Sequence, residues 1–235
     1  MIFLHEGLGS ISMWRDFPQQ VADATGCEAI VYSRYGYGRS TPLRSVPRDV
    51  RYMHDEALRD LPCLLDALEV DEHFLFGHSD GGSISLIHAG NAGRAVAGTI
   101  VLAPHVFVED VALENIVLAG KAFENPETRL RERLARHHDD VDGVFWGWNR
   151  TWLSAAFRSW NIENYLPAIQ GPVLAIQGED DEYATMAQLD RIAAAAPDVD
   201  LVKLADCRHS PHKDQPGAVI EATTSFISRI LDARD

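Results

Sequence analysis

The stretch that decides the fold is FLFGHSDGG at residues 74–82. Its first three residues are apolar and predict a short buried strand, and the apolar segment 84–89 that follows has helical length. Between the two lies Gly-x-Ser-x-Gly, with Ser79 at its centre. A strand, a sharp turn and a helix are the context in which this motif pushes a serine hydroxyl out into a cleft. We therefore predict that Ser79 is a nucleophile.

The residues around Ser79 favour this interpretation over a glycine-rich turn with an incidental serine. Gly77 and Gly81 flank the turn, where a Cβ would collide with the neighbouring backbone. Ser79 would also lie at the N-terminus of a helix, where free N–H groups and the helix dipole favour a developing negative charge.

Composition and charge restrict the class of protein. A chain of 235 residues fits one domain, or one domain with a large insertion. The formal charge of −14 argues against a nucleic-acid partner, because phosphate binding needs a basic face. Three cysteines form no disulfide framework and suit a reducing cytoplasm. No run approaches the ~18 apolar residues of a membrane span, and the N-terminus has no signal-peptide pattern. We expect a cytoplasmic protein without a membrane partner.

Short apolar segments alternate with helical patterns along most of the chain. The predicted strands lie at residues 2–5, 28–32, 74–76, 96–103, 172–177 and 201–204. The predicted helices lie at residues 16–25, 51–68 (with a kink at Pro62), 84–89, 185–196 and 217–231. This alternation indicates an α/β fold with a mostly parallel sheet covered by helices on both faces. In such sheets the ligand binds at the C-terminal ends of the strands.

Residues 105–170 interrupt the alternation and are too long for an ordinary connection. Helical patterns at 109–120 and 127–137 predict a helical lid inserted into a core formed by 1–104 and 171–235. Most of its aromatic residues should hold the insertion together, and a few should give the cavity an apolar wall. These aromatic residues are Phe145, Trp146, Trp148, Trp152, Phe157 and Trp160.

A serine nucleophile needs a base, and the base needs a third group that holds it. The turn after the last predicted strand carries His209, and His212 follows three residues later. Chain order favours His209 as the base over His212. The turn after the preceding strand carries four carboxylates, and spacing from Gly178 favours Asp181 as the acid, with Asp180 as the alternative.

Two further features complete the predicted site. The loop 6–10, EGLGS, has two glycines that let backbone N–H groups turn toward a bound group, as an oxyanion hole requires. His209 and His212 have the spacing of a metal pair, but no third ligand of matching type stands nearby, so we expect no metal. No motif indicates a cofactor, and the glycine loop 36–38 has no P-loop lysine after it.

Four motifs in this order resemble those of the α/β-hydrolase superfamily. They are HEGLGS at 5–10, GHSDGG at 77–82, the turn 178–181 and CRH at 207–209. The resemblance covers nearly the whole chain. It is greatest to lidded bacterial serine esterases and to the C–C bond hydrolases of aromatic degradation.

The resemblance implies a role for each site residue. Ser79 would be the nucleophile, His209 the general base and then acid, and Asp181 the group that orients His209. The backbone N–H of Asp80, with that of Gly7 or Leu8, would form the oxyanion hole. The lid would follow the sixth strand of the family. Many relatives have an apolar residue where this chain has Asp80, whose charge fits only if its side chain turns away.

The chain departs from the family at its start, because the family's N-terminal hairpin is absent. The strand around residues 29–32 would then lie nearer an open edge of the sheet, which favours pairing with another chain. We expect either a partner on this edge, such as the second copy in a homodimer, or a start inside a longer protein.

The expected function is that of a serine hydrolase acting on a small or medium carboxylic ester through an acyl-enzyme. One alternative on the same triad is C–C cleavage of a ring-fission product, whose carboxylate would need Arg150 or Arg158 in the pocket. Perhydrolysis is another reaction for the same triad. A non-catalytic ligand receptor is the least favoured, because the predicted triad is intact, and it stays an alternative because fold alone does not fix function.

Overall fold

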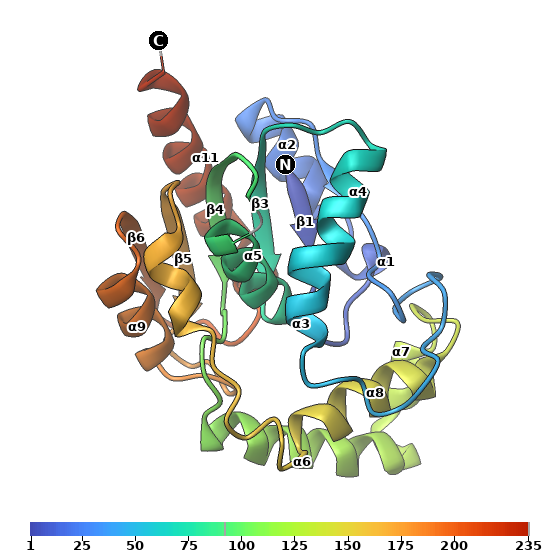
Figure 1. Cartoon of the computed structure of the whole chain (residues 1–235). Coiled ribbons are helices and arrows are strands. Elements are labelled where there is room, and N and C mark those ends of the chain that lie inside the picture. Colours follow the sequence, from blue (N-terminus) through green and yellow to red (C-terminus); the bar gives the residue numbers. More distant parts are fainter. Residues whose placement is uncertain (92, 235) are drawn as a thin grey trace.

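The computed structural model describes residues 1–91 and 93–234. Within them, six strands form one sheet in the order β2-β1-β3-β4-β5-β6, and all their pairings are parallel (Figure 1). The strands are β1 (Ile2–Leu4), β2 (Ile30–Val31), β3 (His73–His78), β4 (Val96–Leu102), β5 (Val173–Gly178) and β6 (Val199–Leu204). The predicted α/β fold with a parallel sheet is confirmed.

The burial of the strands follows from their place in the sheet. Every residue of β1, β3 and β5 is buried, as expected for central strands covered on both faces. β6, at one edge, has only partly buried and exposed residues. β2 forms the other edge, where the sequence predicts an open edge, and it pairs over only two residues. Pairing of this edge with a second copy stays a prediction.

Helices cover both faces of the sheet and create two hydrophobic cores. α2 (Phe17–Thr25) and α11 (Pro216–Asp232) pack on one face, where their apolar side chains meet Phe3 and Phe76. On the other face lie α3 (Tyr52–Asp55), α4 (Leu61–Ala67), α5 (Asp80–Asn91) and α9 (Ala187–Ala195). α1 (Ile11–Trp14) and α10 (Pro211–Asp214) are single turns. In the part of the chain described, no helix combines the length and the apolar character needed to cross a membrane.

The helix predicted at 51–68 is interrupted, as Pro62 suggests. A π-helical segment, Glu56–Asp60, separates α3 from α4, and Pro62 lies in the first turn of α4. Proline has no N–H to donate to the preceding turn, and the Ala57 carbonyl in that turn accepts from His88 Nδ1 at 2.7 Å.

Within residues 105–170, a helical layer lies at one end of the sheet (green to yellow in Figure 1). The layer contains α6 (Asp110–Glu124), α7 (Leu130–Leu134) and α8 (Val141–Trp152), with a 3₁₀ turn at Pro126–Thr128. The predicted helix at 127–137 is therefore much shorter than expected. A second 3₁₀ turn, Glu163–Ala168, packs against α5 and α9 instead. The sequence pattern predicts no helix at the position of α8, although α8 carries four of the six aromatic residues.

Candidate active site

Ser79 occupies a sharp turn between β3 and α5. It adopts a φ of 54°, in the left-handed region that residues with side chains rarely enter. Its N–H donates to the carbonyl of Leu102 at the end of β4, at 2.9 Å. β4 thus holds the turn in place, and the turn directs the Ser79 hydroxyl outward at the C-terminal ends of the strands.

The turn is possible only with glycine on both sides. A Cβ on Gly77 would overlap the carbonyl of Gly81, and a Cβ on Gly81 would overlap the carbonyl of Leu4. Both glycines are therefore required by the close approach of neighbouring backbone, as the sequence predicts.

His209, in the loop between β6 and α10, lies against Ser79. Its Nε2 is 3.0 Å from Ser79 Oγ, and its Nδ1 donates to Asp181 Oδ1 at 2.8 Å. Asp181 follows β5, and the same oxygen accepts the N–H of Tyr183 at 2.8 Å. Because Nδ1 donates to a carboxylate, Nε2 of the neutral ring is left to accept the proton of the serine hydroxyl.

The Asp181 side chain is fully buried, and its surroundings keep it ionised. Burial alone raises the pKa of this carboxyl, but the hydrogen bonds from His209 and from the N–H of Tyr183 outweigh that effect. The pKa of Asp181 therefore lies below its ordinary value, as expected for a carboxylate that accepts several hydrogen bonds.

The two alternative residues lie elsewhere. Asp180 is exposed, and its N–H donates to the carbonyl of Cys207 at 3.0 Å. His212 is buried in α10, where its ring packs 4.8 Å from that of Trp14 and 5.5 Å from that of Phe17. The structure thus brings Asp181 and His209 to Ser79, and neither alternative.

The backbone groups considered for an oxyanion hole lie around the same turn. Within residues 1–91 and 93–234, no hydrogen bond uses the N–H of Gly7 or of Leu8. The carbonyl of Leu8 accepts from Nε2 of His138 at 2.9 Å, which anchors this loop. The N–H of Asp80 belongs to the first turn of α5, where no intrahelical acceptor exists. These donors are available to a negatively charged oxygen.

The Asp80 side chain lies in a buried polar network beside Gly7, and its Oδ2 is 3.1 Å from the position that a Cβ on Gly7 would occupy. Its Oδ2 accepts the hydroxyl of Tyr52 at 2.6 Å, and that hydroxyl accepts the indole N–H of Trp152 at 3.0 Å. Arg34 Nη2 lies 3.9 Å from the same carboxylate oxygen. Burial raises the pKa of Asp80 above its ordinary value, and Arg34 and Tyr52 counteract this only in part. The charge that the sequence left unexplained thus has partners.

Arg34 connects the two segments that carry the backbone donors. Its side chain is almost fully buried, and its Nη2 donates to the carbonyls of His5 at 3.1 Å and Glu6 at 3.0 Å. It therefore holds the loop that leads into Gly7 while facing Asp80. This role is not visible in the sequence, because neither Arg34 nor Tyr52 stands near a catalytic motif.

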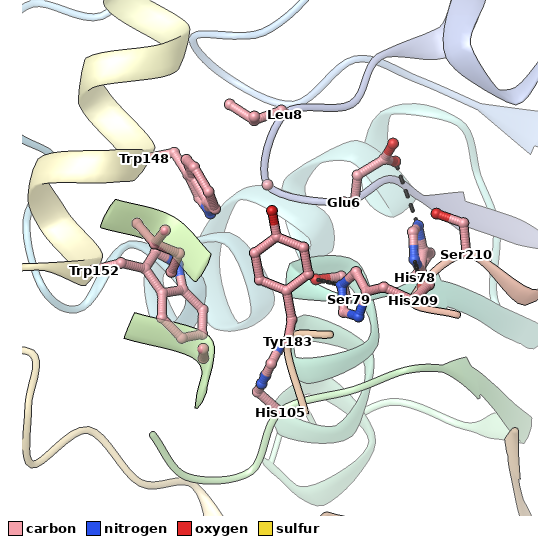
Figure 2. A pocket seen from close by; sticks show the side chains of 13 residues that line it. Glu6, Leu8, His78, Ser79, His105, Trp148, Trp152, Tyr183, His209 and Ser210 are labelled. Atoms are coloured by element: carbon pink, nitrogen blue, oxygen red, sulfur yellow. Dashed lines mark hydrogen bonds and ion pairs between the residues drawn. The ribbon is translucent and has the colours of Figure 1, made fainter. Parts of the chain in front are cut away.

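A cavity of about 110 Å³ opens beside Ser79 (Figure 2). This is well below the ~300–1,000 Å³ typical of sites for drug-sized ligands. The side chains of α6 and α8 form an apolar wall, and His105 and Tyr183 add polar groups. The lining residues are Glu6, Gly7, Leu8, His78, Ser79, His105, Ala112, Ile116, Trp148, Trp152, Tyr183, His209 and Ser210.

Neither arginine considered for a substrate carboxylate lines this cavity. Arg150 lies over the ring of Trp146, 4.9 Å from its centroid, and Arg158 is exposed and paired with Asp110. The lining contains no lysine or arginine. The cavity therefore offers no cation for a ring-fission product.

Behind the triad, His78 supports the loop that carries His209. Its Nε2 donates to the backbone carbonyl of His209 at 2.8 Å, and its Nδ1 faces Glu6 Oε2 at 3.6 Å (Figure 2). Burial raises the pKa of Glu6, but Lys213 and His78 together bring it well below its ordinary value. Among the residues described, no group of three or more His, Cys, Asp or Glu side chains is arranged to hold a metal ion.

The chain belongs to the alpha/beta hydrolase family, whose model matches residues 1–222. It is 22% identical over 256 residues to an sn-1-specific diacylglycerol lipase, ABHD11, of Danio rerio, covering 97% of this chain and 78% of that protein. It is 25% identical over 204 residues to the esterase YbfF of Escherichia coli, covering 77% of this chain and 78% of that protein.

Solved structures show the same fold. An esterase from Thermogutta terrifontis superposes with a TM-score of 0.72 at 20% identity, covering 97% of this chain and 89% of the other. The protein is thus an α/β-hydrolase enzyme, similar to esterases and lipases.

Proposed function

We propose that the protein hydrolyses small carboxylic esters through an acyl-enzyme formed on Ser79. The observation that carries this proposal is the continuous chain of contacts from Ser79 Oγ through the His209 ring to Asp181, at 3.0 and 2.8 Å. Names of relatives support the reaction class, since they include an esterase and a lipase.

In the proposed first step, Ser79 Oγ attacks the ester carbonyl while His209 Nε2 takes the hydroxyl proton. Asp181 stays ionised and stabilises the imidazolium, a role that suits its lowered pKa. The N–H groups of Asp80 and of Gly7 or Leu8 donate to the oxygen that becomes negative. His209 then returns the proton to the leaving alcohol, and a water molecule releases the acid by the same steps in reverse.

Residues 105–170 act as the lid in this proposal. Trp148 and Trp152 of α8 and Ala112 and Ile116 of α6 line the cavity beside the nucleophile. An apolar cover excludes water and strengthens the interactions of charges inside the site. The small cavity favours short acyl or alcohol groups.

Turnover of p-nitrophenyl acetate and butyrate tests the proposal. We expect Ser79→Ala to lower kcat by about 10⁴–10⁶-fold, leaving the catalysis supplied by binding and the oxyanion donors. Ser85→Ala is a matched control, because Ser85 is a buried serine of α5, the helix that follows Ser79, and donates to the Gly81 carbonyl at 2.8 Å. Equal turnover by wild type and Ser79→Ala would defeat the proposal.

A further inference from the structure

We propose that His105 determines substrate specificity by binding an uncharged hydrogen-bonding group of the substrate. On the proposed function, the preferred ester then carries a hydroxyl or a similar neutral polar group within a few bonds of the scissile carbonyl. Four observations carry this inference: the place of His105, its missing partner, its neutrality and the charge of the cavity.

His105 is held rigidly in the cavity wall. It follows β4, and its backbone is fixed by Ser83 of α5, whose Oγ accepts the His105 N–H at 3.2 Å and donates to the His105 carbonyl at 2.6 Å. The ring packs edge-on against Trp152 with centroids 5.1 Å apart, and its centroid is 5.7 Å from that of His209 (Figure 2). A substrate attacked by Ser79 therefore comes within reach of this ring.

His105 is only 2% exposed, its Nδ1 is buried, and among the residues described neither of its ring nitrogens has a hydrogen-bond partner. A buried polar atom without a partner is costly, and most such atoms in folded proteins are paired. Other buried histidines also have a ring nitrogen without a hydrogen-bond partner, namely His54, His73, His78, His88 and His212. Of these five, His78 alone lines the cavity, and its Nδ1 faces Glu6 Oε2 at 3.6 Å. Because the His105 ring lines the cavity beside the nucleophile and faces no such group, a bound substrate is the group that can provide a partner for it.

The ring stays neutral in the working pH range. Burial, with a smaller contribution from His209, lowers the pKa of His105 to about 3. A neutral imidazole has one donor and one acceptor nitrogen, so a hydroxyl, which both donates and accepts, suits either tautomer.

The other lining residues exclude a charged anionic group. The cavity contains the Glu6 carboxylate and no lysine or arginine. A substrate carboxylate would be buried without a cation, which is strongly unfavourable. The small volume, about 110 Å³, restricts the polar substituent to a short chain.

The test compares hydrolysis of five esters, with chain length matched within each comparison. Methyl butyrate is the apolar reference. Methyl 2-hydroxybutyrate and methyl 3-hydroxybutyrate place the hydroxyl on the acyl side, and 2-hydroxyethyl butyrate, compared with propyl butyrate, places it on the alcohol side. We expect wild type to prefer at least one hydroxylated ester by about 10–100-fold in kcat/KM, since a site that binds a polar group rejects an analogue that lacks it.

Three variants assign this preference to the ring. His105→Leu should bring the ratio to about one, whereas His105→Asn, which keeps a donor and an acceptor, should retain part of it. His73→Leu is the matched control: His73 is buried and both of its ring nitrogens lack partners, but it begins β3 at the opposite end from Ser79. It should leave the ratio unchanged. Thermal melting verifies that each variant is folded.

The inference is overturned if wild type prefers none of the hydroxylated esters, or if folded His105→Leu keeps the wild-type ratio. Failure of the proposed function gives a different result, because wild type would then hydrolyse none of the esters. Hydrolysis of all of them at equal rates leaves the proposed function intact and defeats the role of His105 alone.

Discussion

Two buried aspartates flank Ser79, and their surroundings have opposite effects. Asp181, in the turn after β5, accepts hydrogen bonds from His209 and the Tyr183 N–H, and its pKa lies below its ordinary value. In Asp80, at the first turn of α5, burial dominates and raises the pKa. A buried carboxylate beside a nucleophile can therefore either assist the proton transfer or hold the surrounding backbone in place.

The geometry of the second aspartate indicates a structural role. Tyr52 of α3, Trp152 of α8 and Arg34 converge on Asp80, and Arg34 also holds the loop before Gly7. The network therefore joins the helical layer 105–170 to both segments that carry the proposed oxyanion donors. The network contributes to activity by holding these two backbone segments in position.

The largest expected effect is on turnover, and it comes from removing the charge of Asp181. Asp181→Asn should lower kcat by about 10³–10⁴-fold, because a neutral amide no longer holds His209 in the proton-accepting tautomer. Asp180→Asn is the matched control, since Asp180 is the exposed neighbour and should have nearly wild-type turnover. Ester hydrolysis by the purified variants measures both, and a larger loss in Asp180→Asn would reverse the assignment.

The corresponding change at Asp80 should act first on stability. Asp80→Asn leaves the buried Arg34 charge without its facing carboxylate, which we expect to lower the free energy of unfolding by about 3–5 kcal/mol. Tyr52→Phe keeps both charges and removes one hydroxyl, so it should cost about 1–3 kcal/mol. Urea denaturation measures both values. If Asp80→Asn abolished turnover while leaving stability unchanged, the two aspartates would not have the separate roles argued above.

The smallest expected effect concerns stability at low pH, which buried histidines lower as well as the aspartates. Burial, with His88 nearby, lowers the pKa of His73 to about 4, against about 6.5 in the unfolded chain. Below pH 6.5 the unfolded state binds a proton that the folded state does not, so stability falls as the pH drops from 7 toward 4.

Replacing His73 should weaken this dependence. In His73→Leu, the difference in unfolding free energy between pH 7 and pH 5 should shrink by up to about 2 kcal/mol. Denaturation curves at the two pH values provide the measurement. An unchanged difference would assign the acid sensitivity to other groups.

Much of the fold was predictable, because apolar strands and helical patterns alternate so regularly. The prediction missed α8, where Gly143, Gly147 and several aromatic residues lower the helix propensity. Its buried residues Val144, Trp148 and Trp152 nevertheless recur at helical spacing, which was the available signal.

The candidate site was predictable only where chain order carries information. Order selected Ser79, Asp181 and His209, whose side chains lie in contact; their catalytic roles stay predictions. His105 could have been found by the same rule, because it follows a strand at the ligand edge. The contact of Tyr52 with Asp80 could not, because it depends on how α3 and α5 pack.

A fluorophosphonate probe tests the central claim most directly, because it labels only an activated nucleophile. After treatment, intact mass and peptide mapping should show one adduct per chain, located on Ser79. Ser79→Ala should take up no label, and His209→Ala should take it up much more slowly. An unlabelled wild-type chain, or an adduct on another residue, would contradict the account.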